Sequence, residues 1–132
     1  MKWGAIVTVI ENLHDPIFQP PLEQFQKSIN FRNGLPPDHS NAIKESVNSL
    51  EAVLQIITGM PSVSLPQILT NTTLDLDSHM VRIMKELYGI GSAVQGGRHA
   101  GVGGLIPSSI DSDCVIHLSA ACINYAISIY ES

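Results

Sequence analysis

Residues 38–59 read DHSNAIKESVNSLEAVLQIITG and carry the strongest structural signal in the chain. Apolar side chains recur here at intervals of four and three residues, the period of an α-helix with one buried side. They are Ile43, Val47, Leu50, Leu54 and Ile57. Asp38 is a suitable N-cap, and Gly59 followed by Pro61 is a suitable stop. We predict a helix over residues 39–58 that packs into a bundle.

The opposite side of this predicted helix is polar. Lys44, Asn48, Glu51 and Gln55 form a stripe that is typical of a solvated helix face. A functional alternative is that Glu51, or Glu45 on the flank, reaches the glycine-rich segment at 89–104 and orients the Arg98 side chain there.

Further helices are expected on both sides of 39–58. Before it, residues 3–13 form a short apolar helix, 16–21 an irregular link, and 22–32 a second helix that Asn33-Gly34 ends. After it, residues 64–71 give one or two helical turns. A helix at 78–88 follows, with Met80, Val81, Met84, Leu87 and Tyr88 facing inward, and Gly89 stops it.

The last predicted helix, 111–130, is apolar nearly all round and has Ser109 or Asp111 as its cap. Such a helix is either central to a bundle or half of a subunit interface. No alternation typical of strands is present. The chain is therefore expected to be all-α, a bundle of about five to six helices in one domain over residues 1–132.

Cysteine and histidine usage on this last helix argues against a disulfide or a metal site. Cys114 and Cys122 are eight residues apart, roughly 12 Å along a helix, which is too far for a disulfide. Both are expected to be small buried hydrophobes in a reducing compartment. Cys114 and His117 have the spacing of half a zinc site, but no second half-site follows, so no metal and no other cofactor is predicted.

The charge and hydropathy of the chain limit the classes of partner that it is expected to bind. The 132 residues carry a net charge of −5, which gives no general attraction to nucleic acid or to an anionic membrane. The N-terminal apolar run is interrupted by Glu11, and no apolar stretch approaches the length needed to span a bilayer. We expect a cytoplasmic protein without a membrane partner.

The most chemically suggestive segment is GIGSAVQGGRHAGVGG at residues 89–104. Glycines let backbone N–H groups approach a ligand, the Arg98 guanidinium matches a phosphate, and His99 is suited to proton transfer near neutral pH. Gly96, Gly97, Arg98 and His99 are therefore the candidate binding residues for a phosphate or another anion. The segment matches neither a P-loop nor a dinucleotide-binding motif. The alternative is a surface loop in which Arg98 and His99 are incidental.

The order of these motifs resembles the C-terminal domain of bacterial abortive-infection (phage-resistance) proteins, which is grouped with the HEPN helical bundles. The resemblance covers residues 38–130 and rests mainly on NAIKESVNSLEAV and on the ELYG…GGRHA block; residues 1–37 add N-terminal helices and a link. It implies a helical bundle that often forms a homodimer. It also implies a phage-defence setting with a protein partner or a fused defence domain.

Two functions follow from the resemblance. HEPN domains are frequently metal-independent endoribonucleases with an arginine and, four to six residues later, a histidine at a dimer cleft. Here His99 follows Arg98 directly, so only these two residues carry over as catalytic candidates, with Glu51 as an orienting group. The first hypothesis is an RNA-cleaving or RNA-binding domain. The second, which we favour, is a non-catalytic module for dimerisation, ligand sensing or partner docking; enzyme activity stays open.

Overall fold

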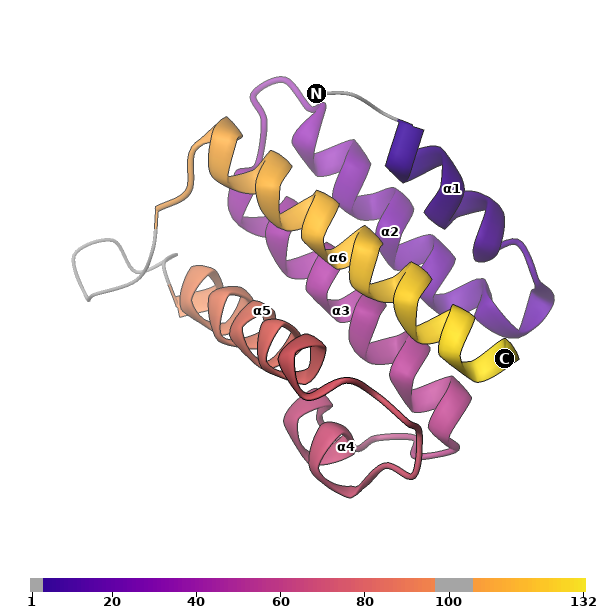
Figure 1. The fold of residues 1–132 in the computed structure, drawn as a ribbon. Coiled ribbons are helices and arrows are strands. Elements are labelled where there is room, and N and C mark those ends of the chain that lie inside the picture. Colours follow the sequence, from indigo (N-terminus) through magenta and orange to yellow (C-terminus); the bar gives the residue numbers. More distant parts are fainter. Residues whose placement is uncertain (1–3, 97–105) are drawn as a thin grey trace.

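The computed structural model describes residues 4–96 and 106–132 (Figure 1). The helices are α1 (Gly4–Asn12), α2 (Gln19–Arg32), α3 (His39–Thr58), α4 (Leu65–Asn71), α5 (Ser78–Gly96) and α6 (Ser109–Glu131), with a 3-10 turn at Pro16–Phe18. No strand occurs in these described ranges. The predicted all-α bundle of five to six helices is confirmed.

Helix α3 lies at the centre of the bundle and has the predicted boundaries. The Asp38 carboxylate accepts a hydrogen bond from the backbone N–H of Asn41 at 3.0 Å and caps its first turn. Gly59 ends the helix with φ of 66°, a left-handed conformation that glycine adopts without steric cost.

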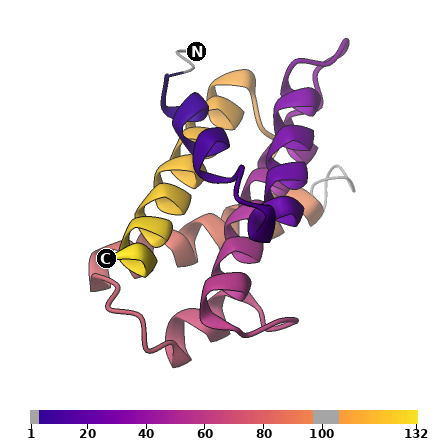
Figure 2. The same ribbon diagram turned by 90° about the vertical axis from the view of Figure 1, so that its right-hand side faces the viewer.

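The other helices surround α3. In Figures 1 and 2, α1 lies beside α6 and α2 beside α3, so that α1 and α6 form one layer over α2 and α3. Helix α5 packs against α3 and α6, and α4 packs against α3 and α5. One apolar cluster joins all six helices. Its largest fully buried side chains include Phe25, Ile43, Leu50, Leu54, Met84, Leu87, Ile116 and Ile123.

Buried serines join α3 to its two largest neighbours. Ser49 Oγ donates to the carbonyl of Pro21 in α2 at 2.8 Å, and Ser46 Oγ lies 3.3 Å from Ser119 Oγ in α6. Ser28 of α2 donates to the carbonyl of Ala42. Small side chains bring these helices close together, and each buried hydroxyl has a partner, so its burial carries no uncompensated desolvation cost.

The irregular link predicted at 16–21 is wrong. Asp15 accepts a hydrogen bond from the N–H of Ile17 and starts a 3-10 turn, after which α2 begins at Gln19. Pro20 and Pro21 occupy the first turn of α2, where a helix does not need their missing N–H groups. Proline at a helix start was therefore misread as a break.

The predicted end of the fifth helix at Gly89 is also wrong, because α5 continues to Gly96. A glycine inside a helix costs about 1 kcal/mol relative to alanine. Leu87 before it and Val94 after it are both buried in the core, and their packing outweighs that cost.

Helix α6 begins at Ser109, and its cap is Ser108 rather than the predicted Ser109 or Asp111. Ser108 Oγ accepts from the N–H of Asp111 at 3.2 Å, while Asp111 Oδ2 accepts from the N–H of Ser108 at 2.8 Å. These reciprocal bonds form a capping box, and the hydrogen bonds that the Asp111 carboxylate accepts from Ser108 lower its pKa.

Helix α6 is also the one helix in the described ranges that is long and apolar enough, by length and composition, to cross a membrane. This corrects the expectation that no stretch has the required length. Half of its most apolar window is buried inside the bundle, as in the central helix of a helical core.

Candidate functional site

The first half of the glycine-rich segment, residues 89–96, belongs to α5, and the second half, residues 97–104, lies outside the described residues. Gly96 is the last residue of α5. Gly97, Arg98 and His99 belong to residues 97–105, which the structure does not describe. Their predicted roles in catalysis and anion binding stay predictions.

The third catalytic candidate, Glu51, lies near the middle of α3 and is half-buried. Its Oε2 accepts a hydrogen bond at 2.8 Å from the backbone N–H of Leu65, the first residue of α4. Ser64 occupies the N-cap position of α4 but makes no side-chain capping bond there. The Glu51 carboxylate therefore supplies the missing cap and attaches α4 to α3.

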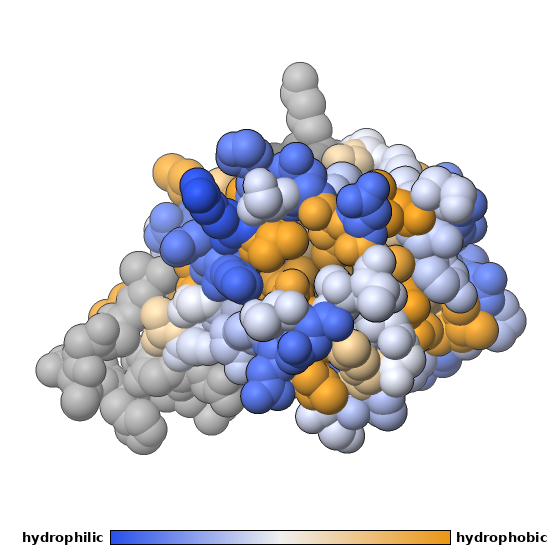
Figure 3. Space-filling model, turned by 60° about the horizontal axis from the view of Figure 1, so that its bottom comes forward, coloured by the Kyte–Doolittle hydropathy of each residue, from blue (hydrophilic) through white to orange (hydrophobic). Residues whose placement is uncertain are grey.

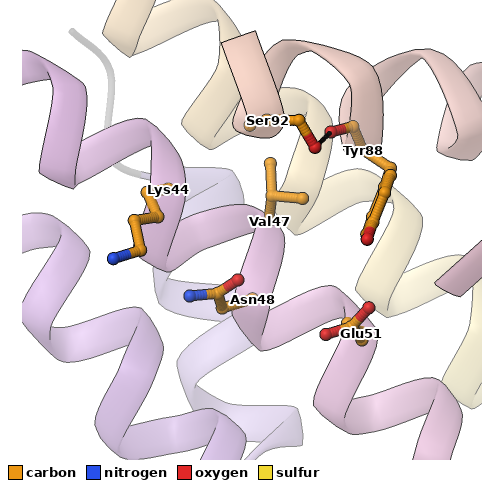
Figure 4. A pocket seen from close by; sticks show the side chains of 7 residues that line it. Lys44, Val47, Asn48, Glu51, Tyr88 and Ser92 are labelled. Carbon is orange, nitrogen blue, oxygen red and sulfur yellow. Dashed lines mark hydrogen bonds between the residues drawn. The ribbon is translucent and has the colours of Figure 1, made fainter. Parts of the chain in front are cut away.

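Glu51 also lines a cleft between α3 and α5 (Figure 4). The cleft has a volume of about 180 Å³. Helix α3 contributes Lys44, Val47, Asn48 and Glu51, and helix α5 contributes Tyr88, Gly91 and Ser92. Figure 4 shows Lys44, Asn48 and Glu51 following one another along α3, with Tyr88 reaching from α5 toward Glu51.

A close approach of the two helices forms the floor of this cleft. A Cβ atom placed on Gly91 would lie 3.3 Å from both Cβ and Cγ1 of Val47, tighter than most such contacts. Glycine therefore lets α5 rest directly on Val47. The longer side chains of Asn48 and Tyr88 line the cleft beside this contact.

Three polar groups in the cleft are unpartnered. The Lys44 ammonium, the Asn48 amide and the Tyr88 hydroxyl make no side-chain hydrogen bond or ion pair with any described residue. Each of these side chains is half-buried. Ser92 differs, because its hydroxyl donates to the carbonyl of Tyr88 at 3.1 Å. The cleft therefore offers a cation, an amide and a phenol that are free to bind a ligand.

The charges at the two ends of the cleft are opposite. Lys44 and Glu51 are seven residues apart on α3, which places them roughly 10 Å apart along the helix axis. Asn48 lies between them. The potential of the cleft is thus dipolar, with the positive end toward the start of α3 and the negative end toward α4.

Three polar residues of α6, Asp113, His117 and Asn124, make structural contacts. Asp113 binds the Arg32 guanidinium of α2 through both oxygens, at 2.7 and 3.0 Å, and this pair lowers the pKa of Asp113. Asn124 accepts from Asn12 of α1 at 2.7 Å. His117 Nδ1 lies 2.8 Å from the carbonyl of Asp113. The Asn124 and Asp113 contacts fasten α1 and α2 to α6, whereas the His117 contact lies within α6.

The two cysteines differ. Cys122 is buried as predicted, and burial raises the pKa of its thiol to about 11. Cys114 is exposed, so the prediction that it is buried is wrong. Within residues 4–96 and 106–132, no three histidine, cysteine, aspartate or glutamate side chains are grouped in a way that could hold a metal ion.

Cys114 belongs to an uncharged stripe along the outer side of α6. Successive turns place Ile110, Cys114, Leu118 and Ala121 at the surface. Ile110 is 79% exposed and Leu118 39% exposed.

A different view, with the bottom of Figure 1 turned forward, shows apolar side chains in the middle of that surface with hydrophilic ones around them (Figure 3).

Sequence reasoning recognised the Lys44–Asn48–Glu51 stripe but interpreted it as solvated, and it missed Ser92 as a neighbour of that stripe. The available signal was Gly91, a glycine inside a helical pattern, which marks a close approach of two helices. Periodicity does not say which helix approaches, so the cleft required the tertiary structure.

Comparison with known proteins finds no family model, no curated protein and no solved structure that matches this chain.

Proposed function

We propose that this chain is a non-catalytic, HEPN-like helical module of the abortive-infection type that senses a small polar ligand in the α3–α5 cleft. The observation that carries the proposal is the set of three unpartnered polar groups, from Lys44, Asn48 and Tyr88, around one hollow. Convergent polar groups in a concave site are the usual mark of ligand recognition.

The chemistry of the cleft favours binding over catalysis. Its described lining residues include no histidine or cysteine, the side chains best suited to proton transfer or nucleophilic attack near neutral pH. The carboxylate among them, Glu51, is held by the N–H of Leu65 at the start of α4. Occupation of the cleft would therefore affect how α3, α4 and α5 are held together.

Simple fragments test this proposal. Acetate, methylammonium and N-methylacetamide represent the groups that Lys44, Glu51 and Asn48 can bind. When each is added to ¹⁵N-labelled protein, we expect chemical-shift changes to concentrate at the backbone amides of the cleft and at the Asn48 side-chain amide. If no fragment shifts these resonances more than those of the exposed residue Gln26 on α2, the sensing proposal is wrong.

The proposal includes a homodimer formed through the outer stripe of α6. An antiparallel two-fold pairing of this face sets Leu118, near its middle, against its own copy, and Cys114 and Ala121 are small enough for the helices to approach closely. Sedimentation equilibrium should detect a dimer that Leu118→Glu dissociates. Gln26→Glu adds the same charge on α2 and should leave it intact. A wild-type protein that is still monomeric at a concentration of about 100 µM would contradict the proposed homodimer.

The ribonuclease alternative has its own test. The wild-type protein is incubated with a mixed RNA pool in EDTA, beside Arg98→Ala and His99→Ala. We expect no cleavage above background. Cleavage that persists in EDTA and disappears in both variants would overturn the non-catalytic proposal and assign the activity to the Arg98-His99 pair.

A further inference from the structure

We infer that the ligand of the α3–α5 cleft is a short, extended peptide with free termini, about three residues long, with its carboxylate at Lys44 and its ammonium group at Glu51. This inference rests on the proposed sensing function and names its ligand class. It follows from the order of the polar groups along the cleft, from the offset of Lys44 and Glu51 along the α3 axis and from the size of the hollow.

The order of the groups matches a zwitterion with an amide in the middle. Along α3 the cleft presents a cation at Lys44, a neutral amide at Asn48 and an anion at Glu51. A lone anion would satisfy Lys44 but be repelled by Glu51, and a polyamine would satisfy Glu51 but be repelled by Lys44. A molecule with both charges at opposite ends satisfies both residues.

The offset between Lys44 and Glu51 along α3 sets the number of residues that we infer. The two residues are seven positions apart, so their Cα atoms are offset by roughly 10 Å along the helix axis. An extended peptide advances about 3.3 Å per residue. Three residues therefore span the distance, whereas two fall short and five extend past Glu51.

The Asn48 side chain is suited to form hydrogen bonds with a peptide backbone. Its side chain has one carbonyl acceptor and one amino donor, both without a partner among the described residues. A peptide unit offers the complementary acceptor and donor. The Tyr88 hydroxyl and the second oxygen of the Glu51 carboxylate remain available beside it, since only Oε2 of Glu51 binds Leu65.

The hollow accepts small residues. Its volume of about 180 Å³ is below the roughly 300–1,000 Å³ of pockets that enclose drug-sized ligands. Val47 and Gly91 form an apolar floor that a methyl group can contact. Side chains that point away from the floor stay in solvent, so the cleft recognises termini and backbone rather than sequence.

Trialanine is the probe that tests this inference, by titration of ¹⁵N-labelled full-length protein. Its matched analogues are N-acetyl-trialanine, trialanine amide, dialanine and pentaalanine. Because hydrogen bonds between charged groups are the strong ones, we expect each terminal cap to weaken binding about tenfold. Dialanine and pentaalanine should each bind more weakly than trialanine.

Two variants assign the ends. Lys44→Met removes the cation, and the protein should then bind trialanine and its amide equally. Glu51→Gln keeps an oxygen for the N–H of Leu65 but removes the charge, and this protein should bind trialanine and its N-acetyl analogue equally. The control, Arg82→Met, removes a charge from an exposed position of α5 outside the cleft lining and should behave as wild type. The ¹⁵N spectra show that each variant is folded.

The outcomes separate the inference from the proposed function. Equal affinity for capped and free trialanine, or a preference unchanged in Lys44→Met and Glu51→Gln, overturns the peptide inference. Cleft shifts with the single fragments but none with trialanine also overturn it while leaving the sensing function in place. Absence of both kinds of shift overturns the two together.

Discussion

Toward α2 and α6, helix α3 packs through apolar residues and through serines whose hydroxyls are all hydrogen-bonded. Toward α5, the Lys44 and Asn48 side chains have no partner within residues 4–96 and 106–132. Ser46 and Ser49 on the first side are fully buried and bonded to α6 and α2. The second side meets α5 at Gly91 and opens into a cleft. The contrast teaches that one helix can serve stability on one face and recognition on the other, because a bonded buried polar group holds structure and an unbonded accessible one is available to a ligand.

The largest expected effect is a difference in stability between two truncations, one on the packed side of α3 and one on its cleft side. Leu50→Ala removes a fully buried side chain and should lower the free energy of unfolding by about 2–5 kcal/mol. Asn48→Ala removes a side chain without a partner and should change it by less than about 0.5 kcal/mol. Urea denaturation followed by circular dichroism measures both. Comparable losses would show that the cleft side contributes to stability.

The Arg32–Asp113 pair tests the inner attachment of α2 to α6. The nearby guanidinium holds the pKa of Asp113 below its ordinary value of 3.8, so the stabilisation is present above that value and is lost as pH falls through the lowered pKa. Asp113→Asn should cost about 1 kcal/mol at pH 7. The difference between the wild-type protein and the variant should shrink below about pH 4. A difference that stays constant between pH 7 and pH 2 would contradict this assignment.

Alanine substitutions at two glycines of α5 test whether this helix rests on Val47 at the floor of the cleft. Gly89 has open space around it, so Gly89→Ala should stabilise the helix by about 0.5–1 kcal/mol. Gly91→Ala places a methyl group 3.3 Å from Val47, and the strain should cancel most of that gain. Thermal unfolding of the two variants side by side gives the comparison. Equal gains would mean that α5 does not rest on Val47.

The reactivity of the two cysteines distinguishes the buried face of α6 from its exposed face, and this test requires no substitution. Cys114 is exposed on the single chain and should react with a thiol reagent at pH 8 in folded protein that is kept monomeric by dilution. Cys122 is buried, its pKa is raised to about 11, and it should react only in denaturant. Mass spectrometry should count one label per folded chain and two per unfolded chain. Two labels in the folded protein would contradict the burial of Cys122.

Local sequence signals predicted the structure correctly where a residue acts on its immediate neighbours in the chain. Asp38 caps α3 and Gly59 ends it as predicted, because capping and left-handed glycine are properties of a few consecutive residues. Met84 and Leu87 are buried as their helical spacing predicted. Local signals failed where tertiary contacts compete with local preference. Gly89 did not end α5, and Cys114 is exposed although it lies on an apolar helix.

The sequence by itself determined the class of the fold, because a repeated apolar face with a period of 3.6 residues can be buried only as a helix in a bundle. Only the tertiary structure decided which side of α3 lines a cleft. Lys44, Asn48 and Glu51 form the same polar stripe whether water or α5 lies opposite. It is the contact of Gly91 with Val47, between residues far apart in the chain, that places Tyr88 beside that stripe and turns a solvated face into a cleft.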